Sequence, residues 1–107
     1  MDINKYDKFC IYKIYQPELP DLIYIGSTTN FSQRKSQHKK NINNKVSKKY
    51  NYPLYQYMRG CGGFEKFKIE IIEHYPCKNK LEGLKKEQEL IDLHKAKLNT
   101  IKSSVNK

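Results

Sequence analysis

Two short segments near the start of the chain, residues 9–15 and 22–27, consist mostly of apolar and aromatic residues. Both segments are rich in isoleucine and tyrosine, residue types that suit a pleated and half-buried surface. The intervening residues 16–21 include Pro17 and Pro20, which argue against a continuing strand and mark a loop. The pattern therefore predicts a β-hairpin.

The predicted hairpin carries two tyrosines whose relative position bears on function. Side chains alternate between the two faces of a sheet along each strand. If the hairpin folds back about Glu18, Tyr12 and Tyr24 come opposite each other on the same face. Tyrosine on a strand is most often an ordinary packing residue, so the alternative is that both belong to the core. We interpret this face as the floor of a functional site.

Two helices are predicted after the hairpin. Residues 31–40 follow a Ser/Thr/Asn cluster in which Asn30 or Thr29 can act as the helix N-cap. Residues 53–59 begin with proline, which suits a first helical turn, and carry an apolar stripe. The glycine-rich residues 60–63 are expected to end this second helix.

The second half of the chain predicts one more strand and one long helix. Residues 64–75 alternate between apolar and polar with a period of two, which indicates a strand. Asn79 and Glu82 have the spacing of a capping box and predict a helix over residues 80–96. Residues 98–101 are interpreted as a short extended return to the core.

These elements predict a single domain of the α+β class over residues 1–107, with its core at about 8–101. The element order is β-β-α-α-β-α, a three-stranded antiparallel β-sheet flanked by helices. The polar ends, residues 1–7 and 102–107, are expected to be loose.

The chain is strongly basic, with 21 lysines and arginines against 11 acidic residues and a net charge of +10. Such an excess on a small domain points to a polyanionic partner, most often nucleic acid. The alternative is solubility in a lysine-rich proteome. Only Arg34 and Arg59 are arginines, so each is expected to be needed for its planar fork of donors.

Other compositional features exclude whole classes of protein. The three cysteines form no Cys-x-x-Cys pair, which predicts free thiols and argues against a structural zinc site. The sequence has no apolar run near 18 residues and no signal-peptide pattern, so no membrane partner is expected. We expect a soluble protein in the cytoplasm or nucleus of its host cell.

One acidic residue of the last predicted helix interrupts an apolar stripe. The stripe is formed by Leu81, Leu84, Ile91 and His94. Glu87 falls between its members, and a carboxylate on a core-facing stripe is costly unless it is paired, hydrogen-bonded or bound to a metal. Glu89 lies about 200° around the helix from Glu87 and is expected to face solvent. Glu87 is therefore a candidate site residue, and the alternative is a stripe-edge position with an ion pair to a lysine.

In combination these residues resemble the GIY-YIG endonuclease superfamily, over about residues 8–100. The two signature tripeptides stand as Cys10-Ile11-Tyr12 and Tyr24-Ile25-Gly26, with cysteine in place of the first glycine. That glycine supplies backbone and packing rather than chemistry. The other motif positions, in chain order, correspond to Arg34, His38, Glu87 and Asn99.

The resemblance implies metal-dependent hydrolysis of DNA phosphodiester bonds by in-line attack of water, with one Mg²⁺ or Mn²⁺ ion. A hard cation of this kind takes oxygen ligands, which assigns Glu87 to the metal. Arg34 would hold the scissile phosphate through its bidentate fork. Tyr12 would act as general base, favoured as phenolate by nearby cations, and His38 would take or share its proton.

The resemblance also assigns supporting roles. Tyr24 would hydrogen-bond the water or the phosphate, and Asn99 would hold the hydrogen-bond network of the site in place. Lysines near these positions are candidate contacts to the DNA backbone: Lys13, Lys35 and Lys39. We therefore expect a bare catalytic module, without the separate DNA-recognition region found in homing endonucleases of this family.

Two alternative functions remain open. The first is a non-catalytic nucleic-acid-binding module with the same fold, which would use the positive charge and stacking tyrosines. The second is a small basic structural protein. Binding alone needs no carboxylate facing a polyanion, so the position of Glu87 favours the nuclease.

Overall fold

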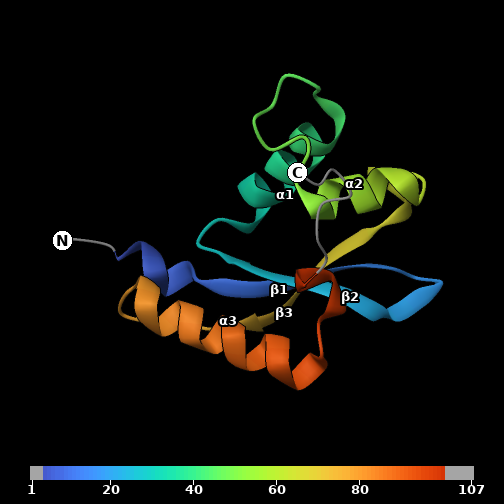
Figure 1. Cartoon of the computed structure of the whole chain (residues 1–107). Helices are drawn as coiled ribbons and strands as arrows, with labels where there is room; N and C mark the ends of the chain where they lie inside the picture. The colour runs from blue at the N-terminus through green and yellow to red at the C-terminus, as the bar shows by residue number, and fades with distance from the viewer. Residues whose placement is uncertain (1–3, 101–107) are drawn as a thin grey trace.

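A three-stranded antiparallel sheet lies at the centre of the computed structural model, which describes residues 4–100 (Figure 1). The strands are β1 (Cys10–Gln16), β2 (Leu19–Thr28) and β3 (Lys68–His74), arranged in the order β2-β1-β3. The hairpin β1–β2 and the pair β1–β3 are both antiparallel, which confirms the predicted α+β class.

Helices cover both faces of this sheet (Figure 1). α1 (Phe31–Asn43) and α2 (Pro53–Gly60) lie over one face, and α3 (Lys80–His94) lies over the other. Short 3₁₀ helices complete the described chain: η1 (Lys5–Lys8), η2 (Phe64–Lys66) and η3 (Lys97–Asn99). The predicted order β-β-α-α-β-α is therefore confirmed.

Two apolar clusters fill the spaces between the sheet and its helices. The cluster beneath α1 and α2 includes Tyr12, Ile14, Ile42, Leu54, Met58 and Ile69. The cluster beneath α3 includes Phe9, Ile11, Ile23, Ile25 and Leu90. The period of two along β1 and β2 sends neighbouring side chains into different clusters, because successive strand residues point to opposite faces.

The pairing of β1 with β2 differs from the prediction by two residues. Tyr12 pairs with Gly26, and Ile14 pairs with Tyr24, so the two tyrosines are diagonal neighbours. The prediction that they lie directly opposite is wrong. A shift of two residues leaves both side chains on the same face of the sheet, so the predicted face is the observed one.

The connection between these strands is shorter than the predicted loop over residues 16–21. Gln16 already pairs with Leu19, so only Pro17 and Glu18 form the turn, and Pro20 lies within β2. The strand tolerates this proline because β2 is at the edge of the sheet and its pairing is irregular in this stretch. This irregularity is also the reason why the observed pairing of Tyr12 differs from the predicted one.

Local signals at the helix starts agree with the structure. The Asn30 side chain accepts a hydrogen bond from the Gln33 backbone N–H and caps α1. The Asn79 side chain does the same for Glu82 at the start of α3, while the Glu82 carboxylate accepts from the Lys78 N–H. The bonds from Gln33 and Glu82 satisfy N–H groups that a helix leaves unpaired at its N-terminus, and the bond from Lys78 fixes the residue before the cap.

The predicted apolar stripe of the last helix is wrong. Its members Leu81, Leu84 and His94 are exposed, and α3 instead turns Gly83 and Leu90 toward the sheet. Close packing explains the difference, because a Cβ atom on Gly83 would lie 2.5 Å from Cζ of Phe9. Glu87 lies four residues after Gly83 and three before Leu90 and is half-buried on this inward face, whereas Glu89 is exposed as predicted.

Several boundaries also differ from the predictions. β3 begins at Lys68 rather than Phe64, because positive φ angles at Gly62 and Gly63 lead into the 3₁₀ turn η2. The expected extended return over residues 98–101 is the 3₁₀ turn η3 up to Asn99, and Ile101 lies outside the described residues.

The prediction that both ends of the chain are loose can be compared with the structure at the start of the chain only. The expectation of a loose start is wrong for η1, which Asn4 caps while its amide donates to the Lys78 carbonyl at 3.1 Å. The tail 102–107 lies outside the described residues. No helix within residues 4–100 is both long and apolar enough to cross a lipid bilayer.

The contact between Gly83 and Phe9 gives a stability test. Alanine at position 83 gains about 1 kcal/mol of helix propensity, but overpacking a filled core costs roughly 1–3 kcal/mol. Phe9 is only 4% exposed, and the tip of its ring would have to move aside to admit the new methyl group. We expect Gly83→Ala to lower the free energy of unfolding by roughly 1 kcal/mol or more, measured by chemical denaturation.

Gly60→Ala is the matched control, because a Cβ atom on Gly60 would meet no atom within 4 Å. It should leave stability unchanged or raise it slightly. A Gly83→Ala protein at least as stable as wild type would contradict the packing explanation for this glycine.

Candidate active site

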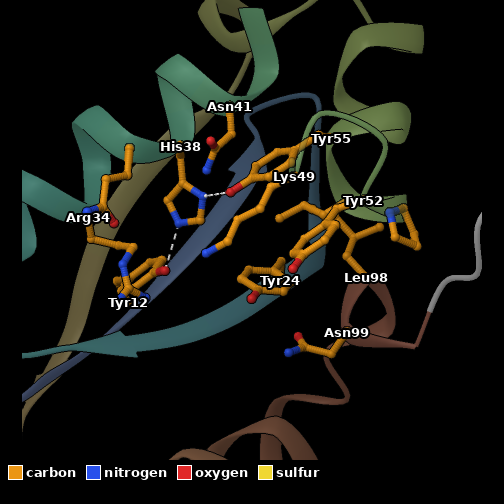
Figure 2. A pocket seen from close by; sticks show the side chains of 13 residues that line it. Tyr12, Tyr24, Arg34, His38, Asn41, Lys49, Tyr52, Tyr55, Leu98 and Asn99 are labelled. Atoms are coloured by element: carbon orange, nitrogen blue, oxygen red, sulfur yellow. Dashed lines mark hydrogen bonds between the residues drawn. The ribbon is translucent and has the colours of Figure 1, made fainter. Parts of the chain in front are cut away.

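The Tyr12 side chain connects the apolar core to a polar site. Its ring is 1% exposed within the cluster beneath α1 and α2. Its hydroxyl lies 2.7 Å from Nε2 of His38, which comes from α1 (Figure 2). One buried hydrogen bond therefore joins the first strand to the first helix at the position of two predicted site residues.

Gly26 makes this position of Tyr12 possible. It is the residue of β2 that pairs with Tyr12, and a Cβ atom there would lie 2.6 Å from the Tyr12 hydroxyl oxygen. Even alanine would displace the hydroxyl from its place beside His38. The last glycine of the second tripeptide thus leaves space for the functional group of the first.

His38 is held from both ring nitrogens. Nε2 contacts the Tyr12 hydroxyl, and Nδ1 lies 2.7 Å from the hydroxyl of Tyr55 on α2. Burial, followed by the positive charges of Arg34 and Lys49, lowers the pKa of His38 to about 4. The imidazole is therefore neutral at pH 7, with one ring nitrogen as donor and the other as acceptor.

No sequence pattern singles out Tyr55, which lies among packing tyrosines on an amphipathic helix. Its hydroxyl is the second hydrogen-bond partner of His38, and Asn41 hydrogen-bonds to the same hydroxyl. The oxygen of the Asn41 amide accepts from Ser47 at 2.7 Å, which leaves its N–H₂ group to donate to Tyr55. A polar chain thus runs from Ser47 to Tyr12.

Burial also decides the protonation of the two signature tyrosines. It raises the pKa of Tyr12 well above its usual range, and the nearby Arg34 guanidinium opposes this only in part. Burial and then the Glu87 carboxylate raise the pKa of Tyr24 to about 12. Both hydroxyls are protonated at neutral pH, so a resting phenolate at Tyr12 is not favoured by the protein groups alone.

Ser27 connects side chains from the two faces of the sheet. Its carbonyl accepts a hydrogen bond from Nη1 of Arg34 at 3.1 Å, and its hydroxyl donates to Oε1 of Glu87. Arg34 comes from α1 and Glu87 from α3, which pack on opposite faces. The predicted cation and carboxylate therefore meet at the end of β2. Glu87 is therefore hydrogen-bonded by the Ser27 hydroxyl, whereas the alternative interpretation expected an ion pair between Glu87 and a lysine.

Asn99 acts on the backbone of β2 next to Tyr24. Its Nδ2 donates to the Ile25 carbonyl at 2.8 Å, and its Oδ1 accepts from the Ile25 N–H at 2.7 Å. The side chain therefore takes the place of a neighbouring strand at the open edge of the sheet. Asn99 fixes the strand that carries Tyr24, and its amide makes no bond to the other predicted site side chains within residues 4–100.

Two adjoining hollows meet at three predicted residues. One, of about 390 Å³, lies beneath α1 and α2, and the other, of about 400 Å³, extends toward Glu87 and α3. The residues that line both are Tyr12, Tyr24 and Arg34. A ligand at this junction can contact the tyrosines and the guanidinium while it extends into both hollows.

The donor set at this junction suits a hard divalent cation held jointly with a substrate. Within residues 4–100 no cluster of three or more histidine, cysteine, aspartate or glutamate side chains is placed to hold a metal. Glu87 is half-buried, and its Oε2 has no hydrogen-bond partner among the described residues. Mg²⁺ commonly binds one carboxylate together with waters and substrate phosphates, so Glu87 fits that requirement.

The lysines predicted to contact DNA lie on different parts of the protein surface. Lys13 packs over the Tyr15 ring and lines a hollow on the α3 side of the sheet. Lys35 and Lys39 are exposed on α1, where Lys39 forms an ion pair with Glu65 at 3.9 Å. None of the three lines the two hollows that contain Arg34, whereas Lys49 does, and it carried no sequence signal within its lysine-rich loop.

The comparison with known families agrees with this geometry. Residues 8–101 match the family described as the GIY-YIG catalytic domain. The chain belongs to the GIY-YIG family. This is a family of nucleases, and the match covers all the signature residues that meet at the junction. No curated protein and no solved structure matches the chain.

The departure from the GIY-YIG signature is accommodated by the fold. Cys10 stands in place of the first glycine, is 2% exposed, and pairs with Thr28 on one side and His74 on the other. It lies two residues before Tyr12, where the pairing of β1 with β2 is regular and the pairing with β3 shifts between Ile11 and Tyr12. The cysteine is a free thiol, as are the other two.

The environment of His38 predicts a pH dependence of stability. The pKa is near 6.5 in an unfolded chain and about 4 in the folded protein. Between these values the unfolded state binds more protons, so stability falls as the pH drops through this window. We expect this residue to account for a loss of about 3 kcal/mol by pH 4, measured by urea denaturation across the range.

His38→Gln should flatten this part of the profile because it removes the titrating group. His94→Gln, at an exposed position on α3, is the control and should keep the wild-type slope. Equal slopes for wild type and His38→Gln between pH 6.5 and pH 4 would show that His38 is not buried as a neutral ring.

Proposed function

We propose that the protein is a divalent-metal-dependent DNA endonuclease that hydrolyses phosphodiester bonds by in-line attack of water. The observation that supports this most is the junction of the two hollows, where a buried tyrosine, an arginine and a carboxylate come together from three elements. A basic surface charge of +10 suits a DNA substrate.

Arg34 and Glu87 have different charged partners in this proposal: Arg34 binds the scissile phosphate and Glu87 binds the metal ion. The Arg34 guanidinium, held by the Ser27 carbonyl, presents its remaining N–H groups to the scissile phosphate and to the charge that grows on it. Glu87 would hold Mg²⁺ or Mn²⁺ with its carboxylate, oriented by the Ser27 hydroxyl. Such an ion, when bound, stabilises the leaving oxygen.

Tyr12 and His38 supply a route for the proton of the attacking water. Both are neutral at pH 7, so the Tyr12 O–H donates to Nε2 of His38 while the His38 Nδ1–H donates to Tyr55. As water attacks, its proton passes to the Tyr12 oxygen, and the Tyr12 proton passes to Nε2. This concerted transfer avoids a free phenolate, which burial disfavours, and the imidazolium that it forms, which burial also disfavours, is stabilised by the negative charge of the phosphate at the site.

Tyr24 completes the floor of the site from the next strand. It is half-buried and protonated at neutral pH, and its hydroxyl can donate to a phosphate oxygen or to the water. Asn99 keeps this strand in place through the Ile25 backbone. Lys35 and Lys39 on α1 remain candidate contacts to the flanking DNA backbone, and Lys13 would reach only DNA that wraps to the α3 side.

The first test is cleavage of supercoiled plasmid with Mg²⁺ or Mn²⁺, with EDTA as a control. Glu87→Gln and Tyr12→Phe should each lower the cleavage rate by about 100-fold or more, because each removes a group from the reacting centre. Glu89→Gln, two residues along on the exposed face of α3, should cut like wild type. Circular dichroism establishes that each variant is folded.

Metal-independent cutting would contradict the role of Glu87. Wild-type protein that binds plasmid and branched DNA but leaves both intact would favour the alternative function, a non-catalytic nucleic-acid-binding module.

A second test concerns Tyr55, the partner that fixes which His38 nitrogen is free to accept. Tyr55→Phe removes the acceptor for Nδ1–H, so we expect the cleavage rate to fall roughly tenfold or more with unchanged DNA affinity. Tyr57→Phe on the same helix is the control, because that ring packs against Phe67 away from both hollows. A Tyr55→Phe enzyme with the wild-type rate and pH profile would show that His38 needs no second partner.

A further inference from the structure

The hollow beneath α1 and α2 has a wall that the proposed reaction does not use. This wall is formed by Lys49 and Tyr52, which lie on the connection between α1 and α2. Figure 2 shows Lys49 directed into the hollow, with its amino end on the side of Tyr12 and Tyr24. Tyr52 borders the same space and is 49% exposed.

The connection that carries these two residues is held in a defined conformation by hydrogen bonds. Successive backbone bonds close turns along it: Ser47 N–H to Asn44 O at 3.0 Å, Tyr50 N–H to Ser47 O at 3.1 Å, and Tyr52 N–H to Lys49 O at 2.9 Å. The last of these turns places Lys49 and Tyr52 side by side. The Asn44 side chain also accepts from the Val46 N–H at 3.0 Å.

Arg59 fixes the same connection from α2. Its two terminal nitrogens donate to the carbonyls of Ile42 at 3.1 Å and Tyr50 at 2.7 Å. Its guanidinium also lies over the Tyr50 ring, 3.6 Å from the centroid. The planar fork expected of this rare arginine therefore holds the loop in one shape. Ordering of this kind lowers the entropy that a flexible loop would lose on binding a ligand.

Tyr52 is presented as a fixed aromatic surface. Its ring is nearly parallel to that of Tyr55, with an interplanar angle of 9° and centroids 6.1 Å apart. Pro53 follows it directly and restricts the backbone at the start of α2. One part of the ring thus packs against Tyr55, while nearly half of the residue is exposed and part of it lines the hollow.

An aromatic ring beside a lysine can bind two parts of a nucleotide, the base and the phosphate. Bases stack on tyrosine rings in single-stranded nucleic acid, and lysine binds phosphate. Bases within a duplex are already stacked on their neighbours, so only an unpaired or extruded base can reach such a ring. The hollow opens directly onto Arg34, where the scissile phosphate would bind.

We propose that this hollow is a nucleotide subsite, in which Tyr52 stacks on an unpaired base next to the scissile phosphate and Lys49 binds the adjoining phosphate. The inference rests on the proposed function and deepens it. It makes the substrate a DNA strand that is unpaired, or easily unpaired, on one side of the cleaved bond.

The subsite is tested by binding, in a protein that does not cut. The Glu87→Gln variant is titrated with a single strand and with a blunt duplex of the same sequence, each carrying 2-aminopurine at one position in turn. We expect tighter binding of the single strand and a change of fluorescence at one or two adjacent positions. Uniform fluorescence at all positions would overturn the proposal.

Substitutions at Tyr52 test whether its aromatic ring stacks on the unpaired base. In the Glu87→Gln background, Tyr52→Leu keeps an apolar contact with Tyr55 but removes the aromatic face, and it should weaken single-strand binding by about tenfold. Tyr52→Phe keeps the ring and should bind like the parent protein. Duplex affinity should not change in either variant. If Tyr52→Leu weakens the binding of both forms equally or of neither, the Tyr52 ring serves only to pack against Tyr55 at the start of α2.

Lys49→Ala should weaken single-strand binding and lower the slope of log affinity against log salt by about one charge. Lys48→Ala is the matched control, because Lys48 precedes it in the sequence but does not line this hollow. A larger effect of Lys48→Ala would overturn the assignment of the phosphate to Lys49.

Cleavage assays distinguish a failure of the subsite proposal from a failure of the nuclease proposal. If wild-type protein cuts no DNA but its single-strand binding depends on Tyr52, the nuclease proposal fails and the subsite stands. If wild type cuts duplex and single-stranded DNA equally and Tyr52→Leu has no effect on either, the subsite fails and the nuclease proposal stands.

Discussion

The hydrogen bond between the Tyr12 hydroxyl and His38 is the contact on which the rest of the structure depends. It places a polar pair inside an apolar cluster, where an unpaired hydroxyl or imidazole would be costly. Burial makes each group neutral, and neutrality allows them to share a proton. The same burial that stabilises the fold therefore sets the chemistry that these groups can perform. Gly26 is required because no other residue leaves room for the pair.

The second organising feature is the position of the site between two layers. Tyr12 belongs to the cluster beneath α1 and α2, Tyr24 packs against it and His38 reaches Tyr12 from α1, whereas Glu87 comes from α3 on the other face of the sheet. Ser27 joins the layers because its carbonyl and its side chain serve opposite faces. The strand that carries Ser27 is an edge strand, and Asn99 secures its free side. A three-stranded sheet thus brings groups from both of its faces to one end.

Features that depend on local sequence were predictable, and those that depend on distant contacts were not. The caps at Asn30 and Asn79 and the alternation along β3 are signals within a few residues, and the structure contains them. The register of the hairpin and the facing side of α3 follow from an irregular edge strand and from the contact of Gly83 with Phe9. Tyr55 had no local signal, since its partner His38 lies 17 residues away. The motif residues were found because their order along the chain identifies the family, which spacing alone does not.

The way α3 is attached has a consequence for how the protein loses activity. This helix turns few apolar side chains inward, with Gly83 and Leu90 buried and Leu81, Leu84 and Leu93 exposed. Elements with few buried contacts open locally at a lower free energy than the whole molecule. Opening of α3 would carry Glu87 away while the hydrogen bond between Tyr12 and His38 stayed intact. If Glu87 holds the metal as we propose, local opening of α3 would inactivate the protein without unfolding its core.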